Sequence, residues 1–373
     1  MIKTAMVPFA DLHAQYLTIK PEIDAAISEV ISQSAFIRGR FVDAFENEFA
    51  SAVGTKHCVS CGNGTDALYI AMRSLGVAAG DEVITTAHSW IATSETITQA
   101  GGSVVFCDTD KDAFTIDPKQ IEQKITPRTV GIIPVHLYGQ PANMDEIMAI
   151  ARKHKLWVLE DCAQAHFAKF KGQTVGTFGN AAAFSFYPGK NLGAMGDAGA
   201  VVTNDAALAE KMAIFARHGG LVKGDHRSEG INSRMDGLQA AILSVKLKKI
   251  YDWTQMRQKL AAEYSGRLAN IPGVETPLSG EDREHVYHLY VIRHKKRDLL
   301  KKWLASSGIE TVINYPVALP FLPAYSRLKS RPEDFPNAYG NQSVILSLPI
   351  FPEMASTQLE QVVKQMELFA LRK

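Results

Sequence analysis

The segment Trp157-Val158-Leu159-Glu160-Asp161 is an apolar run that ends in two acidic residues. A short, continuous apolar run is typical of a strand buried on both faces of a parallel sheet. Similar runs recur from about residue 56 to residue 205, and helical patterns lie between them. This alternation predicts an α/β fold in which helices cover both faces of a mainly parallel sheet.

The elements expected in this region follow from the same periodicity. The expected strands are residues 57–60, 82–86, 104–108, 130–137, 157–161, 181–186 and 200–203. The expected helices are residues 66–75, 91–99, 118–125, 144–154 and 206–217. Seven strands of this kind are enough for one large open sheet.

The remainder of the chain indicates a second, smaller domain. One long helical pattern, residues 235–268, leads away from the sheet, and the Pro- and Gly-containing stretch 271–284 then forms a connection. A strand at 286–293 and a helix at 297–307 follow. We therefore expect a large domain with an N-terminal helical segment and a small α+β domain, at residues 1–250 and 251–373.

Composition excludes several classes of protein. Lys plus Arg total 40 and Asp plus Glu total 39, so no net field draws the chain to nucleic acid. No apolar run is long enough to span a bilayer, and the first residues lack the apolar core of a signal peptide. Four cysteines in a chain of this size suit a reduced protein. The sequence therefore predicts a cytoplasmic protein without a nucleic-acid or membrane partner.

A glycine-rich turn, residues 62–66, joins an expected strand to an expected helix. Backbone N–H groups at the start of a helix, together with its positive dipole end, can bind phosphate. The structural alternative is a plain turn in which Thr65 caps the helix. The same residues also match a dinucleotide fingerprint, with Asp81 at 81 − 62 = 19 residues further on. An NAD-dependent oxidoreductase is therefore the rival from another class.

The rival leaves Asp161, Ser185 and Lys190 unexplained as a set. Taken alone, Asp161 could cap the next segment, and Lys190 could be a surface lysine in a Gly-rich loop. Asp161 ends a buried strand, where a protonated pyridinium nitrogen would satisfy its charge. Lys190 follows the expected strand 181–186, and formation of a Schiff base would remove its buried charge. Ser185 lies five positions earlier and could reach a phosphate. Pyridoxal phosphate requires a turn that binds its phosphate, an acid that pairs with its ring nitrogen, and a lysine that forms a Schiff base with it. The turn 62–66, Asp161 and Lys190 would supply these three groups.

Nearly the whole chain resembles the DegT/StrS-type sugar-nucleotide aminotransferases. The motifs that carry the resemblance are residues 7–12, 62–68, 160–166, 184–194, 232–241 and 315–316. The resemblance implies a pyridoxal-phosphate enzyme of fold type I that is a homodimer with active sites at the subunit interface. It also implies a cycle in which L-glutamate supplies an amine, through pyridoxamine phosphate, to a keto sugar on a nucleoside diphosphate.

The resemblance assigns individual residues. Those implied to bind the cofactor are Gly64, Thr65, Trp90, Asp161, Gln164, Ser185, Lys190 and Asn232. Those implied to contact the substrate are Tyr187, Arg217, His218 and Tyr315. Lys190 and Asp161 are the implied catalytic residues, Trp90 stacks on the ring, Gln164 lies near its phenolic oxygen, and Asn232 reaches over from the partner subunit. No metal is implied.

The stretch 187–194 most resembles enzymes that aminate the 3-keto position of dTDP-linked 6-deoxyhexoses. Gly224, Asn314 and Pro320 depart from the family pattern on the side of the sugar. A 4-keto or UDP-linked sugar therefore remains an alternative substrate, and a non-catalytic regulatory protein of the same fold is a further rival. The pair Cys58 and Cys61 has no second pair, which favours structural cysteines over a zinc site.

Overall fold

A computed structural model describes residues 6–372, and its largest element is a seven-stranded sheet. The strand order is β1-β9-β8-β5-β4-β2-β3, and every neighbouring pair is parallel except those made by β9. The strands are β1 (His57–Cys61), β2 (Glu82–Thr86), β3 (Ser103–Cys107), β4 (Thr129–Ile133), β5 (Trp157–Asp161), β8 (Ala181–Ser185) and β9 (Gly199–Thr203). The predicted α/β fold with a mainly parallel seven-stranded sheet is confirmed.

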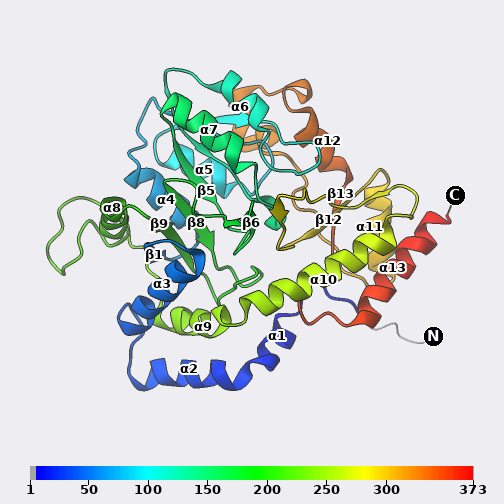
Figure 1. Ribbon diagram of the computed structural model, residues 1–373, viewed down its shortest axis with the longest axis horizontal. Helices are drawn as coiled ribbons and strands as arrows, with labels where there is room; N and C mark the ends of the chain where they lie inside the picture. The colour runs from blue at the N-terminus through cyan, green and yellow to red at the C-terminus, as the bar shows by residue number, and fades with distance from the viewer. Residues whose placement is uncertain (1–5, 373) are drawn as a thin grey trace.

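Helices cover both faces of this sheet, as continuous apolar strands require (Figure 1). In β8, Ala181 and Ala183 pack with one core cluster, whereas Ala182 and Phe184 pack with the other. The helices before and around the sheet are α1 (Leu12–Thr18), α2 (Lys20–Ser32), α3 (Arg40–Val53), α4 (Gly64–Ser74), α5 (Ala92–Gln99), α6 (Pro118–Lys124), α7 (Met144–His154), α8 (Ala206–Ala216) and α9 (Gly237–Leu247).

The last third of the chain, coloured yellow-green to red in Figure 1, builds a third core around a small antiparallel sheet of order β10-β12-β13. Its elements are α10 (Ile250–Leu268), β10 (Val274–Glu275), β12 (Tyr290–His294), α11 (Arg297–Ser306), α12 (Pro336–Val344), β13 (Ile345–Leu348) and α13 (Ser356–Ala370). A further small sheet joins β6 (Lys169–Phe170), β7 (Gln173–Thr174) and β11 (Arg283–Glu284). No helix among residues 6–372 is long and apolar enough to cross a membrane.

Three expected elements differ from the structure. The strand expected at 286–293 begins too early, because β12 starts only at Tyr290. The prediction of a single helix at 235–268 is wrong, because α9 and α10 are separated at Lys248 and Lys249. There the Lys249 N–H donates to the Lys246 carbonyl, three residues back, so the regular helical pattern is lost. The strand expected at 130–137 ends at Ile133. Beyond it, the backbone from residue 134 to residue 136 pairs with Asp161, whose N–H donates to the Pro134 carbonyl at 2.9 Å.

Candidate active site

The carboxyl ends of β5 and β8 and the amino end of α4 meet at one edge of the large sheet. β5 and β8 are parallel neighbours, with Asp161 opposite Ala183. Gly64 at the start of α4 lies so close to Ser185 at the end of β8 that an added Cβ would stand 2.5 Å from the Ser185 Cβ. This is the edge at which open α/β sheets bind ligands.

The turn before α4 leaves backbone donors free. Asn63 caps the helix, because its side chain accepts the Asp66 N–H at 2.8 Å. The N–H groups of Gly64 and Thr65, in the first turn, have no intrahelical partner. Ser233 holds the turn from outside: it accepts the Gly62 N–H at 2.9 Å and donates to Asp66. The expected phosphate seat is thus rigid, and Asn63, rather than Thr65, is the cap.

Asp161 and Lys190 interact electrostatically behind this turn. Asp161 is only 4% exposed, and burial raises the pKa of its carboxyl, while hydrogen bonds from Thr93 and Ala163 lower it. Burial lowers the pKa of the Lys190 amine to about 8, against the opposing effect of Asp161. An amine with this pKa is partly neutral near pH 7.5, which a nucleophile or proton carrier requires.

Gln164, Tyr315 and Trp90 form a second group beside the pair. The Gln164 amide donates to the Tyr315 hydroxyl at 2.8 Å and accepts the Tyr138 N–H at 2.6 Å. Since the Tyr315 oxygen accepts from Gln164, its own proton remains free to be donated. The Trp90 ring lies 5.5 Å from the Tyr315 ring and is 57% exposed, so its face is open to a ligand. His88 supports this group by accepting the Tyr315 N–H at 3.0 Å.

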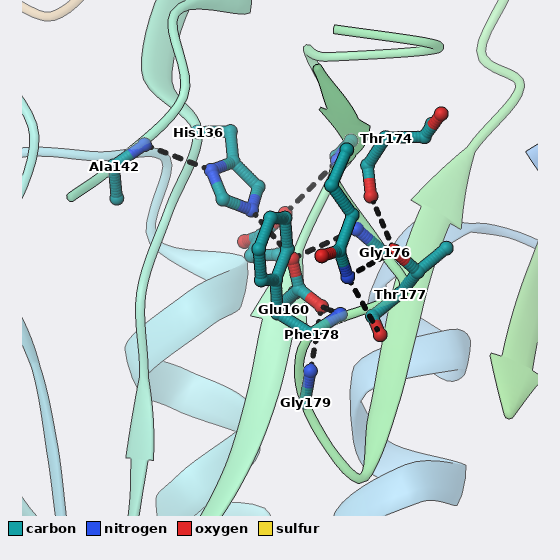
Figure 2. Close-up of polar contacts among 11 residues, drawn as sticks. His136, Ala142, Glu160, Thr174, Gly176, Thr177, Phe178 and Gly179 are labelled. Carbon is teal, nitrogen blue, oxygen red and sulfur yellow. Dashed lines mark hydrogen bonds and ion pairs between the residues drawn. The ribbon is translucent and has the colours of Figure 1, made fainter. Parts of the chain in front are cut away.

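Glu160, next to Asp161, is fully buried and holds the back of the site (Figure 2). Its two carboxylate oxygens accept the N–H groups of Gly176, Phe178 and Gly179 at 2.8–2.9 Å. His136 adds a fourth bond through Nε2 at 3.1 Å. The proton is on Nε2 because Nδ1 accepts the Ala142 N–H. This network fixes the end of β5 and hence the backbone of Asp161.

Among the described residues, His136, Glu160 and Cys162 are close enough together to suggest a metal site. Their lone pairs are already used: four donors occupy Glu160, and the Ala142 N–H occupies His136 Nδ1. Burial raises the pKa of the Cys162 thiol well above its ordinary value, so the thiolate that a metal needs is disfavoured. The cluster is therefore a structural carboxylate network.

Two histidines, the buried His166 and the half-buried His288, interact electrostatically with Lys190, and sequence reasoning gave neither a role beside this amine. Burial lowers the pKa of His166 to about 3, and it also lowers the pKa of His288. Both rings are therefore neutral at pH 7, and neither adds a positive charge beside the amine. The ring nitrogens of His166 and the Nδ1 of His288 have no hydrogen-bond partner within the described chain. No local pattern in the sequence distinguishes such residues from ordinary core histidines.

The remaining expected residues lie at the rim. Tyr187 is 59% exposed, and Arg217 is partly buried with an ion pair to Glu46 at 3.9 Å. The carbonyl of His218 accepts from His226 at 2.8 Å. Asn232 is exposed and pairs with Arg217 in an isolated bridge. The Tyr187 carbonyl accepts the Lys190 N–H at 2.8 Å, but this backbone bond does not involve the Tyr187 ring. Among the described residues, no side-chain hydrogen bond or ion pair joins these four to Lys190 or Asp161, so their expected roles stay predictions.

The geometry fits pyridoxal phosphate. A cradle that a single Cβ would fill lies beside free N–H donors, which suits a phosphate group. A buried carboxylate with few cationic partners suits a pyridinium nitrogen, and a lysine of lowered pKa suits covalent attachment. Lys190, Asp161, Ser185, Gly64 and Thr65 are the residues that would hold it.

Comparisons with known proteins agree with this geometry. A "Pleiotropic regulatory protein" from Geobacillus stearothermophilus is 46% identical over 97% of this chain and 98% of its own length. The dTDP-3-amino-3,4,6-trideoxy-alpha-D-glucose transaminase from Streptomyces venezuelae is 41% identical over 99% of this chain and 98% of its own. The crystal structure of S. venezuelae DesV in complex with a ketimine intermediate superimposes with a TM-score of 0.97, at 41% identity and 99% and 100% coverage.

The family model for DegT/DnrJ/EryC1/StrS aminotransferases matches residues 17–367, which is most of the chain. The residues that would hold the cofactor all lie within this range. The chain therefore belongs to the DegT/DnrJ/EryC1/StrS aminotransferase family, whose cofactor is pyridoxal phosphate or its pyridoxamine form.

Proposed function

We propose that this protein moves an amine from L-glutamate to the keto carbon of a nucleotide-linked 6-deoxy sugar. The favoured substrate is a dTDP-linked 3-keto sugar, which would become a 3-amino sugar. The observation that carries the proposal is the meeting of Lys190, Asp161 and the Gly64–Ser185 cradle at one sheet edge. The name of the S. venezuelae relative, a dTDP-amino-sugar transaminase, supports the substrate class.

When bound, the cofactor supplies an electron sink and carries the amine from one substrate to the other. Asp161 would hold a proton on the ring nitrogen, because its buried carboxylate prefers a cationic partner. Lys190 Nζ, with a pKa of about 8, would act as the general base that takes a proton from the substrate carbon. The protonated amine would then act as the general acid that gives this proton back as the amine is transferred. The N–H groups of Gly64 and Thr65 and the Ser185 hydroxyl would hold the phosphate.

The rim residues would then contact the sugar nucleotide. The Tyr315 hydroxyl, whose proton is free, can donate to an oxygen of the substrate. Tyr187 offers an exposed aromatic face, and Arg217 and His218 lie where α8 ends. Arg217 would suit the diphosphate, since its guanidinium matches phosphate geometry.

We further propose a homodimer in which each subunit completes the other's site. Several large apolar side chains are exposed, as at a surface that another subunit covers, and they include Phe36, Ile37, Trp90, Tyr187 and Met195. Asn232 would reach the partner's phosphate seat, in keeping with its own exposure. We also propose that the two domains meet near residue 250, where α10 begins. The proposed location is the cytoplasm.

The first test is the visible spectrum of the protein loaded with pyridoxal phosphate, before and after addition of L-glutamate. We expect the cofactor's absorption band to bleach, and a dTDP-linked 3-keto sugar to restore it more efficiently than UDP-linked or 4-keto sugars. A band that glutamate does not change would refute L-glutamate as the donor. The absence of any band would show that this chain does not bind pyridoxal phosphate. A regulatory protein or an NAD-dependent enzyme would then be the better interpretation of the chain.

A further inference from the structure

The carboxylate of Asp161 is held by two donors before any ligand is considered. Its Oδ2 accepts the Thr93 hydroxyl at 2.7 Å, and its Oδ1 accepts the Ala163 N–H at 3.1 Å. Thr93 is more deeply buried than Asp161, at 1% exposure against 4%. The Ala163 bond is local in sequence, whereas the Thr93 bond joins α5 to β5 across 68 positions. The distant residue therefore fixes which way the carboxylate faces.

Thr93 is the middle of a polarised chain of hydroxyl groups. The Ser89 hydroxyl lies 3.1 Å from the Thr93 oxygen. An ionised Asp161 can only accept, so the Thr93 proton is directed at the carboxylate. The Thr93 oxygen is then free to accept from Ser89. Donation by Ser89 strengthens the bond that Thr93 makes, because successive hydrogen bonds polarise one another in a medium of low dielectric constant.

The backbone of Thr93 is tied to the residue expected under the cofactor ring. Its N–H donates to the carbonyl of Trp90 at 3.3 Å, in the turn that opens α5. One residue thus connects the loop that carries Trp90 with the carboxylate of Asp161. Burial alone would favour protonated Asp161, and the Thr93 hydrogen bond is the largest of the effects that oppose it.

We propose that Thr93 is a positioning residue, whose hydroxyl keeps Asp161 ionised and aimed so that a proton stays on the cofactor's ring nitrogen. This inference rests on the proposed role of Asp161 and goes beyond it by naming the group on which that role depends. A threonine at this position supplies the hydroxyl, and valine, which has the same shape, cannot.

The test uses the holoenzyme loaded with pyridoxal phosphate that carries ¹⁵N at the ring nitrogen. The ¹⁵N resonance reports protonation of that nitrogen directly. In Thr93→Val we expect the resonance to move toward the unprotonated position, and the half-reaction with L-glutamate to slow by about 10- to 100-fold. Thr93→Ser keeps a hydroxyl and should restore both. A wild-type resonance and rate in Thr93→Val would overturn the proposal.

A matched control separates the loss of the Thr93 hydrogen bond from the general effect of replacing a buried threonine of α5 by valine. Thr96 lies one turn further along α5 and is fully buried. Its hydroxyl donates to the Ala92 carbonyl at 2.7 Å, with a longer contact to the Thr93 carbonyl at 3.5 Å, and not to Asp161. Thr96→Val should leave the resonance at its wild-type position. A shift in Thr96→Val as large as that in Thr93→Val would overturn the specific role of Thr93.

Two further variants keep the result decisive. If Thr93→Val does not fold, Ser89→Ala replaces it: the shift should be smaller and in the same direction, and an unchanged resonance overturns the proposal. Asp161→Asn tests the role on which the inference rests. If its resonance matches the wild type, Asp161 does not face the ring nitrogen, and the proposed function of that residue fails, whatever Thr93 does.

Discussion

Gly64 and Ser185 lie so close together that the α4 amino terminus and the end of β8 form one surface. A Cβ on Gly64 would stand 2.5 Å from the Ser185 Cβ and 3.1 Å from its Oγ. The two residues are 121 positions apart in the sequence (185 − 64), so the sheet alone brings them together. The glycine is required here by space rather than by its backbone angle, because its φ is not positive.

Gly64→Ala should therefore weaken cofactor binding. The methyl group would push α4 away from β8, and the donors of the phosphate seat would move with it. We expect the affinity for pyridoxal phosphate to fall by about 10- to 100-fold, measured by equilibrium titration. Gly266→Ala is the control, since Gly266 lies inside α10 with open space around it and should gain about 0.5–1 kcal/mol of stability. Unchanged affinity in Gly64→Ala would show that the seat lies elsewhere.

The lowered pKa of Lys190 predicts how the apoenzyme captures its cofactor at different pH values. Only the neutral amine attacks a carbonyl, and its fraction grows as pH rises through the pKa. With a pKa of about 8, the rate of covalent capture should rise from pH 6 and level off above about pH 8. Capture can be followed by rapid mixing and reductive trapping, with Lys190→Ala as the blank. A rate that still rises tenfold per pH unit above pH 9 would mean an ordinary lysine.

The large sheet could be predicted because each strand leaves a local signal. The bounds of β2 and β5 agree with the expected strands, since each is a short run with an apolar centre. The order Gly64, Asp161, Lys190 was also visible, because the three motifs are local and each follows a strand. The break between α9 and α10 was not, because Lys248 and Lys249 are good helix formers and the pattern continues through them.

Other parts of the site depend on contacts that no local pattern encodes. Thr93 reaches Asp161 across 68 positions, and Gln164 reaches Tyr315 across 151. Glu160 is a second acidic residue beside Asp161 in the sequence. Neighbouring side chains of a strand point to opposite faces of the sheet, so Glu160 faces away from Asp161. Backbone N–H groups from the turn after β7 occupy the Glu160 carboxylate oxygens. Only the assembled sheet shows which of the two acids has room for a ligand.

Glu160→Gln should destabilise the protein. The amide would turn an N–H₂ group toward backbone N–H donors, which leaves buried donors without an acceptor. We expect a loss of about 2–3 kcal/mol, seen as a lower thermal midpoint. Glu284→Gln, at an exposed ion pair with Lys169, should change the stability by less than about 1 kcal/mol. Equal midpoints for Glu160→Gln and the wild type would show that the network contributes little.

A mixed dimer tests whether two subunits share each site. Lys190→Ala and Asn232→Ala chains are each assayed as homodimers, where both should be nearly inactive, and are then refolded together. Random pairing makes half of the dimers mixed. If Asn232 serves the partner's site, each mixed dimer contains one intact site and one site that lacks both side chains. About a quarter of the wild-type activity should return, as two-fold symmetry requires. Mixing Lys190→Ala with Asp161→Ala is the control, because both residues belong to the same chain's site and no activity should return. A Lys190→Ala and Asn232→Ala mixture that forms dimers and stays inactive would mean that each chain builds its site alone.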